Sequence, residues 1–229
     1  ENPYAIKTIV TSELATAICR QNGVKLHNVL TGFKFIGEVI SEYQKTGKGA
    51  FLFGYEESYG YLKGTHALDK DAVVASVLVC DMAAYYRQKG MTLCDALEAL
   101  YAKYGHYREL TQNIYMEGLD GLARMKALMD ALRQNPPERF AKDPVAEIRD
   151  YLTGLVTELS TGKTTPTGLP ESNVLYYRTQ NDNVVVVRPS GTEPKIKVYL
   201  LLHGDSPQEA ESKLSAYKES VDALIARPL

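Results

Sequence analysis

The sequence predicts an α/β protein: a three-layer α/β domain with a mostly parallel sheet, followed by a smaller α+β domain with an antiparallel sheet and helices on one face. Two observations predict it. Before Gly105, short apolar strand patterns alternate with helix patterns, which is typical of a parallel sheet covered by its connecting helices. After Gly105, several strand patterns follow one another with few helix patterns between them. We therefore predict domains at residues 1–104 and residues 105–229.

Strand and helix patterns alternate through the first part. We expect strands at residues 4–10, 25–30 and 49–55, and helices at residues 13–22, 31–47, 69–90 and 92–105. Thr11 or Ser12 offers a cap for the first helix and Gly23 its end, since hydroxyls favour N-caps and glycine favours the residue after a helix. The strand at 49–55 and the helix at 69–90 are so apolar that we expect both to be buried.

The second part combines strand patterns with amphipathic helix patterns. We expect strands at residues 107–117 and 145–154, two or three more strands within residues 173–204, and helices at residues 121–135 and 206–229. Pro136 and Pro137 end the first of these helices, because proline cannot continue a helix. Residues 160–172 are rich in Thr, Gly and Pro and are expected to form a loop.

The composition is that of an ordinary globular protein. The chain has 229 residues, of which 45% are hydrophobic and 24% charged, and a net charge of −2. This charge argues against broad electrostatic binding of nucleic acid, and no apolar run is long enough to cross a membrane. Cys19, Cys80 and Cys94 lack metal-ligand spacing, so we expect buried free thiols in a reducing, cytoplasmic compartment. Because residue 1 is Glu rather than Met, we expect a fragment of a longer protein, with a processed protein as the alternative.

The stretch "RPSGTEP", residues 188–194, follows four consecutive valines. Gly191 lets backbone N–H groups approach an anion closely, and Ser190 and Thr192 add hydroxyl donors. Arg188 can hold two phosphate oxygens with its planar guanidinium. The alternative is an ordinary β-turn whose hydroxyls bond their own backbone. From the pattern alone, phosphate binding and an ordinary turn are about equally favoured.

The stretch "GYEESYGY", residues 54–61, places two adjacent carboxylates, Glu56 and Glu57, beside the hydroxyl of Ser58. It directly follows an apolar strand, where α/β sheets usually hold ligands. Carboxylates there can accept hydrogen bonds from neighbouring hydroxyls, such as those of a sugar. The alternative is a solvated surface loop. Glycoside hydrolysis is disfavoured, because its two acids must lie on opposite sides of the scissile bond.

Four segments in this order resemble the α-D-phosphohexomutases, specifically bacterial phosphoglucomutase/phosphomannomutase. They are "IKTIVTS" (residues 6–12), "TGFKFI" (residues 31–36), "GYEESYGY" (residues 54–61) and "RPSGTEPKIKVY" (residues 188–199). In that family four domains surround a cleft. The resemblance covers essentially the whole chain and implies that it is the C-terminal half, with the third and fourth domains.

The resemblance implies two sets of binding residues. The family's Gly-Glu-x-Ser loop contacts sugar hydroxyls, and its Arg-x-Ser-x-Thr loop binds the substrate phosphate. The implied sugar-binding residues are Glu56, Ser58, Thr31 and Gly32, with Tyr55 inserted after the glycine. The implied phosphate-binding residues are Arg188, Ser190, Gly191 and Thr192. Residues similar to polar groups that face the cleft in some members are Lys7, His66 and Lys70, whose alternatives are a strand end, a loop cap and a solvated charge.

The resemblance also implies what this chain lacks. The family's phosphorylated serine loop and its Asp-x-Asp-x-Asp magnesium loop belong to the first two domains, and "DKD" at residues 69–71 has only two aspartates. We therefore expect no catalytic residue and no metal site here. The implied enzyme is an isomerase that interconverts hexose 6-phosphate and hexose 1-phosphate through glucose 1,6-bisphosphate, with Mg²⁺ bound outside this chain. Its partners would be the phosphosugar and the N-terminal two domains, and these 229 residues alone are expected to be inactive.

Two other functions stay open at this stage. One is a non-catalytic phosphosugar- or anion-binding module, which the reading frame upstream of this chain would distinguish from the enzyme. The other is a nucleic-acid-binding module built on residues 105–229. The net acidity and the absence of an exposed aromatic–basic strand pattern disfavour it. We expect neither nucleic acid nor membrane as a partner.

Overall fold

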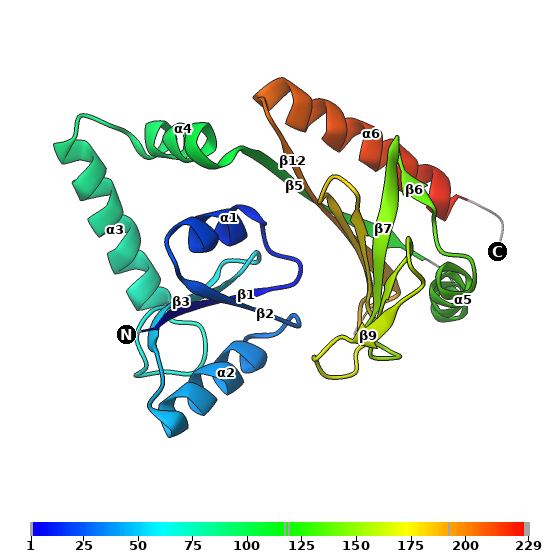
Figure 1. Ribbon diagram of the computed structural model, residues 1–229, viewed down its shortest axis with the longest axis horizontal. Helices are drawn as coiled ribbons and strands as arrows, with labels where there is room; N and C mark the ends of the chain where they lie inside the picture. The colour runs from blue at the N-terminus through cyan, green and yellow to red at the C-terminus, as the bar shows by residue number, and fades with distance from the viewer. Residues whose placement is uncertain (1, 117, 119, 192, 227–229) are drawn as a thin grey trace. The chain divides into compact units, whose positions relative to one another are not determined.

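The computed structural model describes residues 2–116, 118, 120–191 and 193–226. The chain divides into two compact units, Glu1–His106 and Tyr107–Leu229. Figure 1 traces both units from the blue N-terminal strand to the red C-terminal helix.

The first unit has a four-stranded sheet in the order β2-β1-β3-β4. Its strands are β1 (Pro3–Thr8), β2 (Lys25–Val29), β3 (Ala50–Glu56) and β4 (Gly60–Leu62). Strands β1, β2 and β3 are parallel and β4 is antiparallel to β3, so the predicted mostly parallel sheet is confirmed. Helices α1 (Leu14–Gln21) and α2 (Phe33–Thr46) cover opposite faces, as Figure 1 shows. Right-handed crossovers from β1 to β2 and from β2 to β3 require this placement.

Helix α2 supplies much of the first core. Phe33, Ile36 and Ile40 recur at helical spacing and are each at most 3% exposed. They pack against buried side chains of the sheet, and burying each contributes about 1.5–3 kcal/mol. Gly54 permits the contact, because a Cβ atom there would lie 2.8 Å from the Ile36 side chain. The close packing fixes the start of α2 relative to the end of β3.

The first helix begins differently from the prediction. Its N-cap is Glu13, not Thr11 or Ser12. The Thr11 hydroxyl lies 2.6 Å from that of Thr8, and Ser12 Oγ accepts from the N–H of Leu14, so both hydroxyls are engaged in the preceding turn. Gly23 has a φ of 65° just after the helix, which confirms its predicted role as the end residue.

Helices α3 (Ala72–Gln88) and α4 (Leu93–Tyr104) complete the first unit, and here two burial predictions are wrong. In the part of the chain that the structure describes, no residue of α3 is buried. Strand β3 alternates in burial, and Leu52 is 43% exposed. Cys19 is buried as expected, whereas Cys80 and Cys94 on α3 and α4 are exposed. Local apolarity predicts burial only where a covering element is present.

The second unit is an eight-stranded sheet in the order β5-β12-β11-β10-β7-β8-β9, with β6 paired to β7. Its elements are β5 (His106–Tyr115), α5 (Gly121–Gln134), β6 (Arg139–Phe140), β7 (Asp143–Asp150), β8 (Leu155–Glu158), β9 (Thr164–Pro166), β10 (Leu175–Thr179), β11 (Val184–Pro189), β12 (Lys195–Gly204) and α6 (Pro207–Ile225). The expected antiparallel pairing is confirmed between β7, β10, β11 and β12. Residues 160–172 are not wholly a loop, because β9 pairs with β8 at the sheet edge.

Helices α5 and α6 pack on the same core. Leu128, Met129 and Leu132 of α5 join Tyr217 and Val221 of α6 in one buried cluster with the inner side chains of the sheet. This arrangement confirms helices on one face of an antiparallel sheet.

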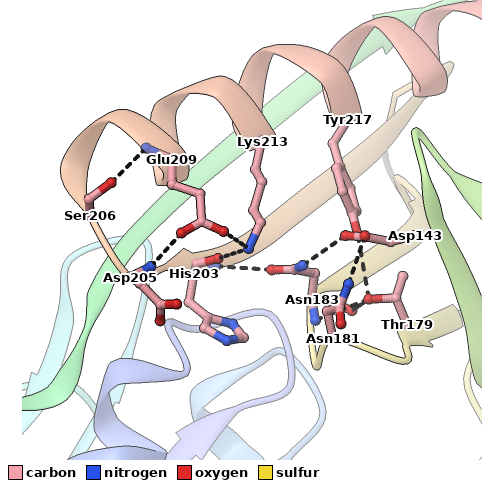
Figure 2. A network of polar contacts seen from close by, with 10 residues as sticks. All are labelled: Asp143, Thr179, Asn181, Asn183, His203, Asp205, Ser206, Glu209, Lys213 and Tyr217. Atoms are coloured by element: carbon pink, nitrogen blue, oxygen red, sulfur yellow. Dashed lines mark hydrogen bonds and ion pairs between the residues drawn. The ribbon is translucent and has the colours of Figure 1, made fainter.

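A buried polar network fixes α6 to the sheet (Figure 2). Asp143 on β7 is 2% exposed, and its carboxylate accepts from the Tyr217 hydroxyl at 2.7 Å. The side-chain amides of Asn181 and Asn183 donate to the same carboxylate at 2.8 and 3.1 Å. A charge this deeply buried is tolerated only when it is hydrogen-bonded. The network therefore joins β7, the β10–β11 turn and α6.

Candidate functional site

The 54–61 loop is a tight connection between β3 and β4. Strand β3 ends at Glu56 and β4 begins at Gly60, so the turn holds only Glu57, Ser58 and Tyr59. Tyr59 has a φ of 64° and is 87% exposed. A non-glycine residue in this region is strained, and such strain often marks a functional turn. Ser58 is exposed beside it.

Glu56 joins this loop to the turn that precedes α2. It is 9% exposed, and its Oε1 accepts from the backbone N–H of Gly32 at 2.7 Å. Gly32 has a φ of 121°, which favours glycine at this position. The structure therefore brings Thr31, Gly32, Glu56 and Ser58 into two adjoining turns at the carboxyl ends of parallel strands. Oε2 of Glu56 remains as an acceptor at that edge.

Glu57 turns towards a different segment from Glu56. Its Oε2 lies 3.4 Å from the Thr8 hydroxyl at the end of β1. Thr8 in turn shares a hydrogen bond of 2.6 Å with Thr11. The two adjacent acids thus engage separate neighbouring turns. The sequence had offered no role for Glu57, because the partner is 49 residues away.

Lys7 is a structural cation at the end of β1. It is fully buried, and its Nζ lies 2.9 Å from both the carbonyl of Thr11 and Oε1 of Glu13. A buried ammonium is stable only when paired and hydrogen-bonded in this way. Lys7 therefore holds the turn between β1 and α1.

His66 and Lys70 lie on the segment between β4 and α3. His66 Nε2 is 2.7 Å from Asp71, whose carboxylate also caps α3. Hydrogen bonds from His66 and from the helix backbone hold the pKa of Asp71 below its usual value. The Lys70 stem lies against Gly60, and its Nζ is 5.3 Å from the Phe33 ring centroid. Of the two, Lys70 is the residue that adjoins the 54–61 loop.

The 188–194 loop connects β11 to β12 and concentrates positive charge. Arg188 and Lys197 are directly opposite each other in the antiparallel pairing, so their side chains share one face. Within the described residues neither has an acidic partner. Lys195 is different, because its ammonium lies 2.6 Å from Glu193. Like charges placed opposite each other repel, which favours an anion between them.

A hollow of about 390 Å³ lies against this loop. Its lining consists of Met125, Lys126, Ser172, Asn173, Arg188, Pro189, Ser190 and Gly191. The predicted residues Arg188, Ser190 and Gly191 are therefore gathered at one concave surface. Thr192, the remaining predicted phosphate-binding residue, lies outside the described residues. The lining residues carry guanidinium, ammonium, hydroxyl and amide groups, and donors of these kinds suit a phosphate group.

Three polar lining residues were missed by the sequence prediction. Lys126 lies on α5, whose pattern indicated only packing, and its Nζ is 2.5 Å from Asp130. Ser172 and Asn173 precede β10. Arg133 donates to the side-chain oxygen of Asn173 at 2.5 Å, which turns the amide NH₂ group of Asn173 the other way. Only the tertiary packing of α5 on the sheet reveals these neighbours.

Among the acidic residues that the structure describes, the arrangement does not fit a magnesium site. In the part of the chain that the structure describes, no three His, Cys, Asp or Glu side chains gather as metal ligands. Asp69 is paired with Lys70, and Asp71 is engaged by His66 and the start of α3. No step of the chemistry is therefore assigned to a metal on this chain. Among the described helices, none is both long enough and apolar enough to cross a membrane.

Comparisons with known proteins bear on both units. The sequence model described as phosphoglucomutase/phosphomannomutase, alpha/beta/alpha domain III matches residues 1–104, and that of the C-terminal domain of the same family matches residues 122–216. A phosphoglucomutase of Staphylococcus aureus (strain bovine RF122 / ET3-1) is 37% identical over 211 residues, which is 92% of this chain. The chain spans only 38% of that relative's length.

Solved structures support the same fold. The open form of pp63/parafusin, a phosphoglucomutase from Paramecium, matches 96% of this chain with a TM-score of 0.65 at 16% identity, over 36% of its own chain. A phosphoglucomutase/phosphomannomutase family protein from Burkholderia thailandensis matches all of this chain with a TM-score of 0.54 at 11% identity, over 39% of its own. With both of its units matched by the family's domain models, this chain belongs to the phosphoglucomutase/phosphomannomutase family.

Proposed function

We propose that this chain is the sugar- and phosphate-binding part of an isomerase that interconverts hexose 6-phosphate and hexose 1-phosphate. The observation that carries the proposal is the cationic hollow at the 188–194 loop. Arg188, Ser190 and Gly191 line this hollow, and Arg188 opposes Lys197 of β12 without an acidic partner among the described residues. Family membership and the S. aureus phosphoglucomutase relative support the choice of a phosphosugar as the ligand.

In this proposal the 188–194 loop holds the phosphate that is not reacting. Arg188 donates two parallel hydrogen bonds, and Lys126, whose ammonium is paired with Asp130, lines the hollow from α5. Ser190 and Asn173 supply neutral donors. The side-chain oxygen of Asn173 already accepts a hydrogen bond from Arg133, which leaves its NH₂ group as the donor. Arg133 is thus a positioning residue for this site. Thr192 is a further proposed donor outside the described residues.

In this proposal the 54–61 loop forms hydrogen bonds with the sugar hydroxyls. Glu56 uses Oε1 to fix the Gly32 turn, which leaves Oε2 to accept from a hydroxyl. The Ser58 hydroxyl is exposed beside it, and Thr31 and Gly32 line the adjoining turn. A carboxylate accepts from vicinal hydroxyls in more than one orientation, which suits a bisphosphate that must turn over during the reaction. Lys70 adjoins the loop as a further contact.

Catalysis of this kind depends mainly on positioning and electrostatic stabilisation. This chain would supply both for the sugar ring and for the phosphate that is not reacting. The nucleophilic serine and the Mg²⁺ site would belong to the remaining domains of the whole enzyme. Glucose 1,6-bisphosphate as the intermediate and a cytoplasmic location stay predictions.

Nuclear magnetic resonance can test the proposal with this chain alone. Inorganic phosphate should shift the amide signals of Ser190 and Gly191 but leave those of residues 54–61 unchanged. Glucose 6-phosphate should shift both sets. If neither ligand moves either loop, the proposed function fails. A steep, salt-dependent affinity for RNA or DNA would instead support a nucleic-acid-binding module.

A turnover assay separates the enzyme from a binding module. The 229 residues alone are expected to give no mutase activity, because the serine and magnesium loops are absent from the sequence. The complete product of the gene should be active, and an Arg188→Ala exchange there should reduce kcat/KM. Activity of the complete product that is unaffected by this exchange would contradict the role of Arg188. An inactive complete product that still binds glucose 6-phosphate would favour the non-catalytic module.

A further inference from the structure

A second hollow, of about 430 Å³, lies between the β6–β7 turn and helix α6. The turn contributes Lys142 to its lining, and the helix contributes Ser212, Ala216 and Tyr217. Pockets for small molecules usually have volumes of about 300–1,000 Å³, so this one can hold a small metabolite. Among the described residues, it shares no lining residue with the hollow at the 188–194 loop. We call it the α6 hollow.

The inner end of the α6 hollow is rigid and has an aromatic surface. Tyr217 and Asp143, its two buried lining residues, are joined by a hydrogen bond of 2.7 Å between hydroxyl and carboxylate. The Tyr217 ring also stacks on that of Phe140, with ring centroids 6.1 Å apart. Beside it, the small side chain of Ala216 leaves room for a ligand. A preformed wall of this kind suits an apolar group, because little ordering is needed on binding.

Most of the charged groups that line the α6 hollow already have partners. The carboxylate of Asp143 accepts hydrogen bonds from three side chains. Glu209 and Lys213 pair at 2.8 Å, and Lys213 also donates to the carbonyl of His203 at 3.0 Å, as Figure 2 shows. The hydrogen bond from Lys213 is the largest influence that holds the pKa of Glu209 below its usual value, and the more distant charge of Lys142 is the smallest. Lys142 itself is exposed and forms no ion pair in the part of the chain that the structure describes, so its ammonium is available to a ligand.

We propose that the α6 hollow binds a small organic carboxylate with an apolar body, of the arylalkanoate class. The carboxylate pairs with Lys142 at the exposed side of the hollow, and the hydroxyl of Ser212 supplies a neutral donor there. The apolar body lies against Ala216 and the ring of Tyr217. A cationic ligand is disfavoured, because both acidic groups of the lining are already hydrogen-bonded or paired. The proposal holds whether or not the 188–194 loop binds phosphate.

Three probes that share an aromatic body and differ in charge can test the proposal. Phenylacetate, phenethyl alcohol and phenethylamine are each titrated into the 229-residue chain, and the amide signals are followed by nuclear magnetic resonance. Phenylacetate should shift the signals of Lys142, Ser212 and Ala216 and leave those of Ser190 and Gly191 unchanged. The alcohol should bind about two- to fivefold more weakly, as expected when one exposed ion pair is lost, and the amine should bind more weakly still.

Variants locate the site and identify the cation. Lys142→Met should bring the affinity for phenylacetate down to that for the alcohol and leave the affinity for the alcohol unchanged. Ser212→Phe should fill the hollow and abolish the phenylacetate shifts, whereas Ser215→Phe, at an exposed position of the same helix outside the lining, should not. All three positions are exposed, so the melting temperature should stay close to that of the unmodified chain.

Several results would overturn the proposal. They are the absence of any phenylacetate shift around the α6 hollow, shifts confined to Ser190 and Gly191, an equal or higher affinity for the amine, and binding that Ser212→Phe leaves intact. The response of Ser190 and Gly191 to inorganic phosphate should be the same in Lys142→Met and Ser212→Phe as in the unmodified chain. A failure of the phosphate site is therefore distinguishable from a failure of the α6 hollow.

Discussion

Replacing Arg188 with Met removes the charge at the centre of the proposed phosphate site and keeps most of the aliphatic stem. Hydrogen bonds to charged groups contribute about 1.5–3 kcal/mol each. Because Arg188 is only half-buried, we take the lower end of this range. A loss of about 1.5–2 kcal/mol corresponds to a roughly 10–30-fold weaker affinity for phosphate.

The same exchange should not destabilise the free protein. Arg188 faces Lys197 across the strand pair, and directly opposed like charges destabilise a sheet by about 0.2–1 kcal/mol. Removing one of them relieves that repulsion. Arg188→Met is therefore expected to raise the free energy of unfolding slightly while it weakens binding, which is the signature of a residue kept for its ligand.

Isothermal titration with inorganic phosphate and with glucose 6-phosphate measures the affinities, and urea denaturation measures the stability. Lys195→Met is the matched control. Lys195 lies on the same face of β12, but its charge is paired with Glu193. This control should leave the affinity within about threefold of the unmodified chain, since the Lys195 charge is already compensated by Glu193. An unchanged affinity for Arg188→Met, or a loss of stability above about 1 kcal/mol, would refute the reasoning.

Three further predictions concern binding, acid stability and the buried network. Glu56→Gln should weaken glucose 6-phosphate binding with little change in melting temperature, because the amide oxygen still accepts from the N–H of Gly32. Glu56→Ala should weaken binding and also lower the free energy of unfolding by about 1–3 kcal/mol, because that N–H loses its acceptor. Equal stabilities of the two variants would contradict this prediction. Burial opposes ionisation of Glu147, but hydrogen bonds from two arginines hold its pKa below its usual value. The ionised Glu147 carboxylate therefore stabilises the folded protein above roughly pH 4.3, and this stabilisation is lost as the pH falls through the folded pKa. In urea titrations the Glu147→Gln variant should accordingly lose less free energy of unfolding between pH 7 and pH 3 than the unmodified chain does. Tyr217→Phe should lower the free energy of unfolding in urea by about 1–3 kcal/mol, because it removes a hydrogen-bond donor from the buried carboxylate of Asp143. A decrease below about 0.5 kcal/mol would show that the hydroxyl is dispensable.

Local patterns were sufficient for the helices and for most of the longer strands, but not for the short strands β4, β6, β8 and β9. The helix patterns at residues 31–47, 92–105 and 206–229 correspond to α2, α4 and α6, and the structure adds a capping box of Thr92 and Asp95 at the start of α4. Motif resemblance selected Glu56 and Gly32 together, but their hydrogen bond joins residues 24 positions apart and depends on how α2 packs on β3. Such contacts follow from tertiary structure and leave no local signal.

The errors have equally physical causes. The apolarity of α3 predicted burial, yet no residue of this helix is buried in the part of the chain that the structure describes. Strand β9 was predicted as loop because an edge strand of Thr and Pro lacks an alternating pattern. The helix pattern at residues 121–135 does not single out Lys126, because it carries no information on the hollow that α5 borders.

The carboxylate of Asp143 has a consequence for how the second unit opens. It accepts from Tyr217, Asn181 and Asn183, which lie 74, 38 and 40 residues along the chain. If α6 frayed from the sheet by itself, a charge would remain in an apolar interior without its shortest hydrogen bond. Separation of the last helix is therefore coupled to opening of the strands beneath it. In amide hydrogen exchange, α6 and β7 should behave as one cooperative unit rather than as a loose helix over a stable sheet.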